Sequence, residues 1–119
     1  MGFVWIKIFV SNIQSSEKER EVEVLVDTGA LITVLPRSLL DELGIQPRGR
    51  RTFSTFGGGK IEREIGGAFL RYNSDFTAAP IAFGEKDDTP ILGVTALESL
   101  GYVVDPVTKK LKRVDLLIL

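Results

Sequence analysis

The residues best suited to chemistry are Asp27, Thr28 and Gly29, which directly follow the apolar pair Leu25-Val26. Such a pair is typical of a buried strand, and a carboxylate at the end of that strand needs neighbouring hydrogen-bond donors. Gly29 lets the backbone turn so that its N–H can approach the carboxylate, and Thr28 adds a hydroxyl. If a second carboxylate comes within about 3 Å, the two share one proton. One carboxylate can then activate a water while the other protonates a carbonyl oxygen.

The composition excludes most alternatives to this carboxylate chemistry. The 119 residues include no histidine and no cysteine, which rules out Ser-His-Asp triads, Cys-His dyads, disulfides and His- or Cys-ligated zinc. Fifteen Lys and Arg nearly balance sixteen Asp and Glu, so no overall field attracts nucleic acid or a membrane. We expect one domain over residues 1–119, without a metal or another cofactor.

Short strands are expected on both sides of Asp27. Alternating apolar residues and turn signals predict strands at 3–10, 21–26 and 32–35, with a polar hairpin tip at 12–20. A short helix follows, which Pro36 opens because a missing N–H costs nothing at that position, and which Gly44 closes.

The second half is predicted to contain two more hairpins, a helix and a closing hairpin. After a loop at 46–51, the first of these hairpins has strands at 52–54 and 61–65 and a mobile, glycine-rich tip at 55–60. Further strands are expected at 67–72 and 75–83, joined by a turn at Asn73-Ser74. A capping box of Thr95 and Glu98 predicts a helix that ends at Gly101, before strands at 102–104 and 111–114. The tally is seven or eight short strands and two short helices, which indicates a mainly β, closed barrel.

On Asp-Thr-Gly alone, a structural turn or helix cap is the favoured interpretation. The wider pattern, however, resembles the retropepsins, which are single-domain aspartic peptidases similar to retroviral proteases. The matching segments are Leu25-Val26-Asp27-Thr28-Gly29-Ala30, Thr33-Val34-Leu35, the glycine-rich hairpin, and Ile91-Leu92-Gly93 before a helix. Their order matches from residue 3 to about residue 114, and the ending is more similar to the cellular and prokaryotic branch than to the viral one. The resemblance implies a homodimeric aspartic endopeptidase with a closed acid-protease barrel, mainly β with two short helices.

The resemblance also implies a role for each matching residue. Asp27 would be the catalytic aspartate, Thr28 would hold the two active-site loops together across a dimer axis, and Gly29 would donate to the carboxylate. The hairpin tip would close over a bound peptide as a flap. The implied substrate-binding residues are Gly29, Ala30, Phe56, Gly57, Gly58 and Gly59. The segment Ile91-Leu92-Gly93 would pack behind the Asp27 loop, and the substrate would lie as an added strand between flap and floor.

Each chain supplies one acid of this kind. The second half has Ile91-Leu92-Gly93 where a two-domain pepsin-like enzyme would have another Asp-Thr/Ser-Gly, and Asp87-Asp88-Thr89-Pro90 has proline where glycine is needed. Because the mechanism needs two carboxylates, an active peptidase requires a homodimer with its site on a two-fold axis. We expect the interface to include the Asp27 turn, the hairpin tips and a terminal strand at 116–119. The expected partners are a second copy and a peptide or protein substrate.

Two positions depart from the viral pattern and leave a second hypothesis open. Viral enzymes have an acid after the alanine of the motif and an arginine after the later Leu-Gly or Ile-Gly pair, whereas this chain has Leu31 and Val94. The alternative is therefore a retropepsin-like module that binds protein or dimerises with little or no catalysis.

The remaining signals favour surface roles. The basic clusters are Arg48, Arg50 and Arg51, and Lys109, Lys110, Lys112 and Arg113. Neither has interleaved stacking aromatics, so we expect solvated faces, and nucleic-acid binding by residues 48–51 is a third hypothesis. Residues 1–7 lack a basic leader and a cleavage site and are too few to cross a bilayer. We expect a cytoplasmic protein with no nucleic-acid or membrane partner.

Overall fold

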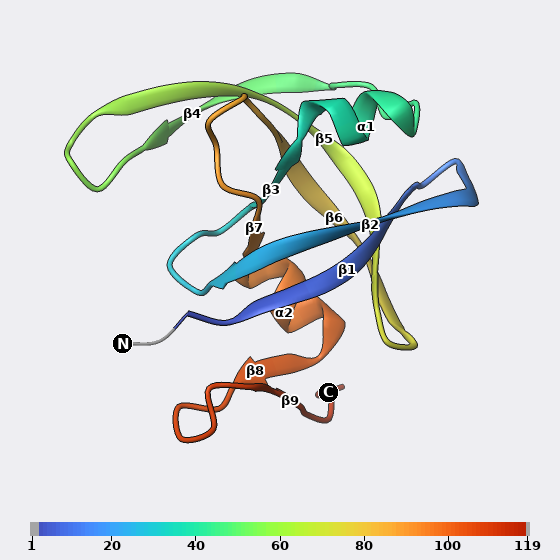
Figure 1. Ribbon diagram of the computed structural model, residues 1–119, viewed down its shortest axis with the longest axis vertical. Helices are drawn as coiled ribbons and strands as arrows, with labels where there is room; N and C mark the ends of the chain where they lie inside the picture. The colour runs from blue at the N-terminus through green and yellow to red at the C-terminus, as the bar shows by residue number, and fades with distance from the viewer. Residues whose placement is uncertain (1–2, 119) are drawn as a thin grey trace.

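The computed structural model describes residues 3–118, which form mostly strands, as expected (Figure 1). In chain order the elements are β1 (Trp5–Asn12), β2 (Ser15–Asp27), β3 (Thr33–Pro36), α1 (Arg37–Glu42), β4 (Gly49–Ser54), β5 (Lys60–Tyr72), β6 (Asp75–Gly84), β7 (Ile91–Gly93), α2 (Val94–Leu100), β8 (Tyr102–Val104) and β9 (Leu111–Arg113). Both helices are short, and among the described residues no helix is long and apolar enough to cross a membrane.

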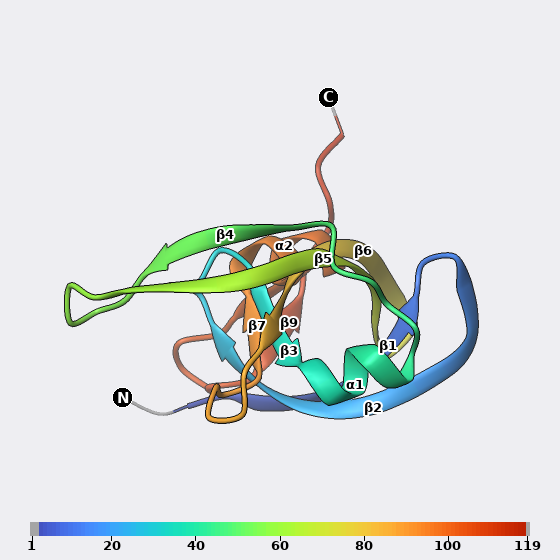
Figure 2. The ribbon, with the colours of Figure 1, turned by 90° about the horizontal axis from the view of Figure 1, so that it is seen from above.

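Seven strands form one sheet in the order β1-β2-β7-β3-β6-β5-β4. Since β1 also pairs with β5, through Phe9↔Arg71 to Ser11↔Phe69, the sheet closes into a ring with β4 as an attached edge strand. The pairs β2–β7 and β3–β6 are parallel, and the others are antiparallel. Figure 2 shows this ring from above, with the β4–β5 hairpin extending to one side. A separate β8–β9 hairpin lies below the sheet in Figure 1.

The core fills the inside of this ring. Alternation along each strand turns every second side chain inward, which accounts for the burial of Ile8 and Val10 on β1 and of Ile81 and Phe83 on β6. α2 covers the core with Ala96, Leu97 and Leu100, and α1 adds Leu40. Burial of each large aliphatic or aromatic side chain stabilises the folded state by about 1.5–3 kcal/mol. The ring is therefore stable and holds the ends of the loops at its edge in place.

The predicted hairpin tip at residues 12–20 is wrong. Only Ile13 and Gln14 form the turn, and β2 begins at Ser15. The Asn12 carboxamide stabilises this turn: its Oδ1 accepts from the Gln14 N–H at 2.9 Å, and its Nδ2 donates to the Leu43 carbonyl at 3.2 Å. The charged residues within 12–20, which suggested a tip, belong to strand β2. They lie in the part of the β1–β2 hairpin that extends beyond the core.

Several element boundaries also differ from prediction. β4 begins at Gly49, inside the predicted loop, because residues 49–54 pair with β5. β5 is one continuous strand rather than two, since Ile65 pairs with β4 on one side and β6 on the other. The turn at Asn73-Ser74 is confirmed, with Asn73 at φ 56°. Likewise, α1 begins directly after Pro36 and ends before Gly44, within one residue of the prediction.

The predicted capping box of α2 is wrong. The helix begins at Val94, its N-cap is Gly93, and no side chain caps it. Instead, the Val94 N–H donates to the Ala30 carbonyl at 2.7 Å, and the Thr95 N–H donates to the Leu31 carbonyl at 3.3 Å. The loop that follows Asp27 therefore satisfies donors at the start of α2 and is held against it.

The C-terminal segment forms no strand in the single chain. Leu116, Leu117 and Ile118 are exposed and lie outside the strands, so a terminal strand over 116–118 is not found. Leu119, the last residue of that prediction, lies outside the described residues, as do Met1 and Gly2 of the N-terminal segment. A role of this segment in an interface stays a prediction.

Candidate active site

Asp27 is the last residue of β2, where the strand leaves the ring and pairs in parallel with Gly93 of β7. The Gly29 N–H donates to its Oδ1 at 2.9 Å, and the Ala30 N–H donates to its carbonyl oxygen at 3.2 Å. A Cβ on Gly29 would lie 3.2 Å from that Oδ1, so glycine allows this close approach. Asp27 is half-buried, and the hydrogen bond within its own turn fixes the direction of the carboxylate.

β7 packs directly behind this turn. The Gly93 N–H donates to the Oγ1 of Thr33 at 3.0 Å, and Thr33 is buried. A Cβ on Gly93 would lie 2.7 Å from the Ile32 carbonyl carbon and 2.9 Å from the Leu31 carbonyl oxygen. Only glycine fits at such distances, so β7 and the 27–32 loop form one tightly packed unit.

A cleft of about 690 Å³ separates this unit from the β4–β5 hairpin. Its lining is mostly apolar, with contributions from the Asp27 loop, β3, β4, β5, β6 and the segment before β7. The apolar residues are Ala30, Leu31, Ile32, Val34, Phe53, Phe56, Ile61, Ala82 and Ile91. Arg51, Arg63, Asp87 and Asp88 add charge to the same walls. An apolar cleft with few polar groups is a common form of binding site for organic ligands and peptides.

The tip of the β4–β5 hairpin is a three-residue loop made of Phe56, Gly57 and Gly58. The Gly58 N–H donates to the Thr55 carbonyl at 3.0 Å, and the Thr55 N–H donates to the Gly59 carbonyl at 2.8 Å. Gly58 has φ 82°, the left-handed conformation that this kind of loop requires at its third position. Phe56 is fully exposed at the tip and also lines the cleft.

The structure brings together only part of the predicted site. Asp27, Gly29, Ala30 and Phe56 line the cleft, whereas Thr28, Gly57, Gly58 and Gly59 do not. Thr28 is exposed beside Asp27, Gly57 and Gly58 lie in the exposed hairpin tip, and the exposed Gly59 directly follows it. Four further residues of the cleft were not predicted from the sequence: Arg51, Phe53, Ile61 and Arg63. They are alternate residues of β4 and β5, and this alternation was the signal that could have placed them on one face of the hairpin.

One wall of the cleft contains an ion pair. Arg63 donates from Nε to Asp88 Oδ2 at 2.7 Å and from its Nη2 to Oδ1 at 3.0 Å, and both side chains are mostly buried. The hydrogen bonds from Arg63 hold the pKa of Asp88 below its ordinary value, and Asp88 raises the pKa of Arg63. This pair joins β5 to the loop before β7.

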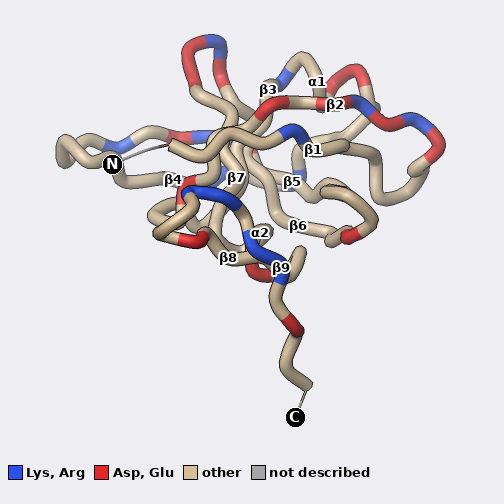
Figure 3. The backbone as a smooth tube through the Cα atoms, turned by 60° about the horizontal axis from the view of Figure 1, so that its bottom comes forward, with Lys and Arg blue, Asp and Glu red and all other residues tan. Residues whose placement is uncertain are grey.

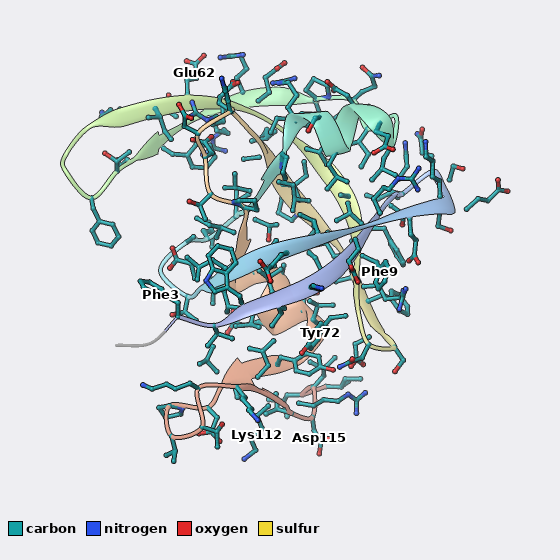
Figure 4. The ribbon with its side chains drawn as sticks, viewed as in Figure 1. Phe3, Phe9, Glu62, Tyr72, Lys112 and Asp115 are labelled. Carbon is teal, nitrogen blue, oxygen red and sulfur yellow. The ribbon has the colours of Figure 1, made fainter. Side chains whose placement is uncertain are left out.

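The second basic cluster lies away from the cleft, on the β8–β9 hairpin (Figure 3). Lys109 and Lys110 adjoin a smaller hollow of about 400 Å³, which is also lined by Phe3, Trp5 and Tyr72. Part of this cluster thus borders aromatic side chains, which the sequence alone did not place there. Figure 4 shows Phe3 and Tyr72 on this side of the molecule. Among the described residues, no group of three or more acidic side chains could hold a metal ion.

A model of the gag-polyprotein putative aspartyl protease family matches residues 13–99, well over half of the chain. The chain belongs to this family. Family membership agrees with the Asp-Thr-Gly turn beside the cleft and confirms the predicted resemblance to the retropepsin-like aspartic peptidases. Among curated proteins, none matches this sequence.

The fold agrees with this family. The chain is similar to the solved structure of EIAV protease complexed with the inhibitor HBY-793, with a TM-score of 0.61 and 19% sequence identity. The match covers 84% of this chain and 89% of that protein. At this identity the similarity shows the fold, so the mainly β, retropepsin-like architecture is confirmed.

Proposed function

We propose that this chain is an aspartic endopeptidase whose active site forms when two copies bring their Asp27 carboxylates together. The observation that carries the proposal is the position of Asp27, which is fixed by the Gly29 N–H on the floor of an apolar cleft. Membership of an aspartyl protease family supports the same chemistry.

The proposed pair would hold one proton between two carboxylates. The ionised Asp27 takes a proton from a water, whose oxygen attacks the peptide carbonyl carbon, while the protonated Asp27 gives its proton to the carbonyl oxygen. Collapse of the tetrahedral intermediate then breaks the C–N bond: the Asp27 that took the water proton gives it to the leaving amine nitrogen, and the other Asp27 takes a proton from a hydroxyl of the intermediate, which restores the shared proton. The Gly29 N–H keeps one carboxylate oxygen in place throughout.

A homodimer is required because the cleft of one chain offers no suitable second acid within the described residues. Asp88 lines the cleft but is paired with Arg63. Asp87 is exposed on the loop before β7, outside any Asp-Thr-Gly turn. The exposed Thr28 next to Asp27 is available to contact its counterpart in a second copy, in agreement with its implied role.

The proposed substrate is an extended peptide. β4 is at the edge of the sheet, so the outer side of this strand has unpaired backbone groups that can hydrogen-bond to an added strand. Apolar side chains on both sides of the cleft provide contact for the peptide, and Phe56 at the hairpin tip would cover it as part of a flap.

Replacement of Asp27 by Asn tests the proposal. Asn keeps the size of the side chain but removes the ionisable group, so cleavage of a peptide library should fall by at least about a thousandfold. Asp41→Asn, on the exposed side of α1, is the matched control and should cleave like the unmodified chain. Full cleavage by D27N would refute the mechanism. Binding of peptides without cleavage by the unmodified chain would instead favour the non-catalytic binding module.

A further inference from the structure

The cleft side of the β4–β5 hairpin places two arginines next to each other. Arg51 and Arg63 are directly opposite in the antiparallel register, and Phe53 and Ile61 are the next pair on the same face. All four side chains line the cleft. Like charges directly opposite each other on neighbouring strands repel, so an anion next to either arginine would relieve this repulsion.

Arg63 already has its anion. Its two hydrogen bonds to Asp88 form a bidentate pair, in which the side chains are 18% and 25% exposed. Asp88 is held in turn by the Glu85 N–H, which donates to Oδ2 at 2.8 Å. The charge of Arg63 is therefore matched by a fixed partner and is not available to a ligand.

Arg51 is in the opposite situation. It is exposed, lines the cleft, and forms no ion pair with any residue from 3 to 118. The adjacent Arg50 lies on the other face of the strand, where its Nε donates to Glu62 at 2.5 Å. Figure 4 shows Glu62 on the outer side of the hairpin, away from the cleft. The cleft wall thus contains a guanidinium with no anion of its own.

We propose that Arg51 recognises an acidic side chain of the substrate and so makes the enzyme selective for Asp or Glu at an outer position of the peptide, on either side of the cut bond because the two copies each supply one Arg51. The inference rests on the proposed peptidase function. A guanidinium binds a carboxylate through two parallel hydrogen bonds, which favours this pair over contacts with neutral side chains.

The position of Arg51 along β4 also indicates which residue of the substrate it contacts. Arg51 precedes Phe56 by five residues, which is about 16 Å at roughly 3.3 Å per strand residue. If the hairpin tips meet above the paired Asp27 residues, a peptide extended along β4 places a residue roughly four or five positions from the cut bond next to Arg51. Asp87 lines the cleft from another wall, so the preference for an acid applies to this position rather than to the whole peptide.

The experiment compares cleavage of a random peptide library by the unmodified chain, Arg51→Gln and Arg51→Glu, with cut positions read by mass spectrometry. The unmodified chain should enrich Asp and Glu at the matching outer positions on the two sides of the cut bond by about threefold to tenfold, as expected for a partly exposed charge-assisted contact. R51Q should abolish this enrichment, and R51E should replace it with Lys and Arg. Arg50→Gln removes the same charge from the opposite face of β4 and should leave the profile unchanged.

The outcomes separate this inference from the proposed function. Cleavage by the unmodified chain with no acid preference, or with one that persists in R51E, would overturn the role of Arg51 and leave the peptidase intact. An absence of cleavage would overturn the proposed function instead. In that case the same library is selected for binding to the immobilised chain. Acid enrichment that is lost in R51Q then supports recognition by Arg51, and no enrichment overturns it.

Discussion

The carboxylate of Asp27 is positioned by backbone groups rather than by other side chains. Its own turn supplies the Gly29 N–H, and the 27–32 loop is fixed from behind by the close packing of Gly93. Backbone donors hold a side chain in one position because they have little freedom once the strands around them have formed. Glycine at these two positions therefore allows the close packing that holds Asp27 in place.

Gly93→Ala is expected to destabilise the protein by about 1–3 kcal/mol, because the added methyl group overlaps backbone atoms that have no room to move. Gly57→Ala is the control, since nothing lies within 4 Å of a Cβ at that position and its φ is not positive. Urea unfolding measures both variants. A Gly93→Ala protein as stable as Gly57→Ala would show that the loop moves aside without cost.

Among the secondary-structure elements, the β4–β5 hairpin is the one that extends farthest from the ring while forming a wall of the cleft (Figure 2). Its base is linked to the loop before β7 by the Arg63–Asp88 pair, whereas its tip has no such link among the described residues. We therefore expect motion to increase toward the tip, which a flap requires. The Arg63–Asp88 ion pair therefore holds the base of the hairpin in place.

The Arg63–Asp88 pair makes stability depend on pH. Because the pKa of Asp88 is lower in the folded than in the unfolded protein, the pair stabilises the fold above the ordinary value of 3.8. This contribution is lost as the pH falls through the folded pKa. Asp88→Asn should therefore lower the free energy of unfolding by roughly 1–2 kcal/mol at pH 6 and by almost nothing below both pKa values.

Chemical unfolding from pH 2 to pH 7 measures this difference. Asp41→Asn provides the control, because Asp41 is exposed and outside the ion pairs of the described residues, and it should give no pH-dependent difference from the unmodified chain. A difference for Asp88→Asn that stays constant down to pH 2 would mean that the ionised carboxylate is not its source.

At the scale of the whole molecule, the proposed homodimer follows from the number of catalytic acids that each chain supplies. Each chain contributes one Asp-Thr-Gly turn, and the Asp27 turn, the hairpin tip and the N-terminal end of β1 lie on one side of the molecule (Figure 1). A second copy on that side would face the first with the same elements. A two-fold symmetric interface of this kind gives both acids identical surroundings.

Mixing experiments test this assembly. If two chains share one site, adding an equal amount of Asp27→Asn to a fixed amount of unmodified chain should reduce total activity to about half. A ninefold excess should reduce it to about a tenth, because most active chains then pair with an inactive one. Added Asp41→Asn, which keeps Asp27, should not inhibit. Activity unaffected by Asp27→Asn would show that each chain acts alone.

Local sequence was sufficient to predict much of this structure. Alternating residues identified the inward face of β1, and Pro36 and Gly44 marked the limits of α1, because these signals depend on neighbours a few residues apart. The turn at Asp27 and the hairpin around the glycine-rich tip were predicted for the same reason. The same local signals failed where distant segments supply the partners, as at Gly93, where carbonyls of the 27–32 loop replace the expected capping box of α2.

Residue types in a fixed order were enough to identify the available acid and the family that the chain resembles, because neither depends on the folded arrangement. The residues that share the cleft with that acid became known from the folded chain. Arg51 and Arg63 are twelve positions apart in the sequence but meet across two strands, and Asp88 reaches Arg63 from a third segment. The pairing of strands determines which arginine is neutralised and which remains available, because an ion pair depends on distance in space.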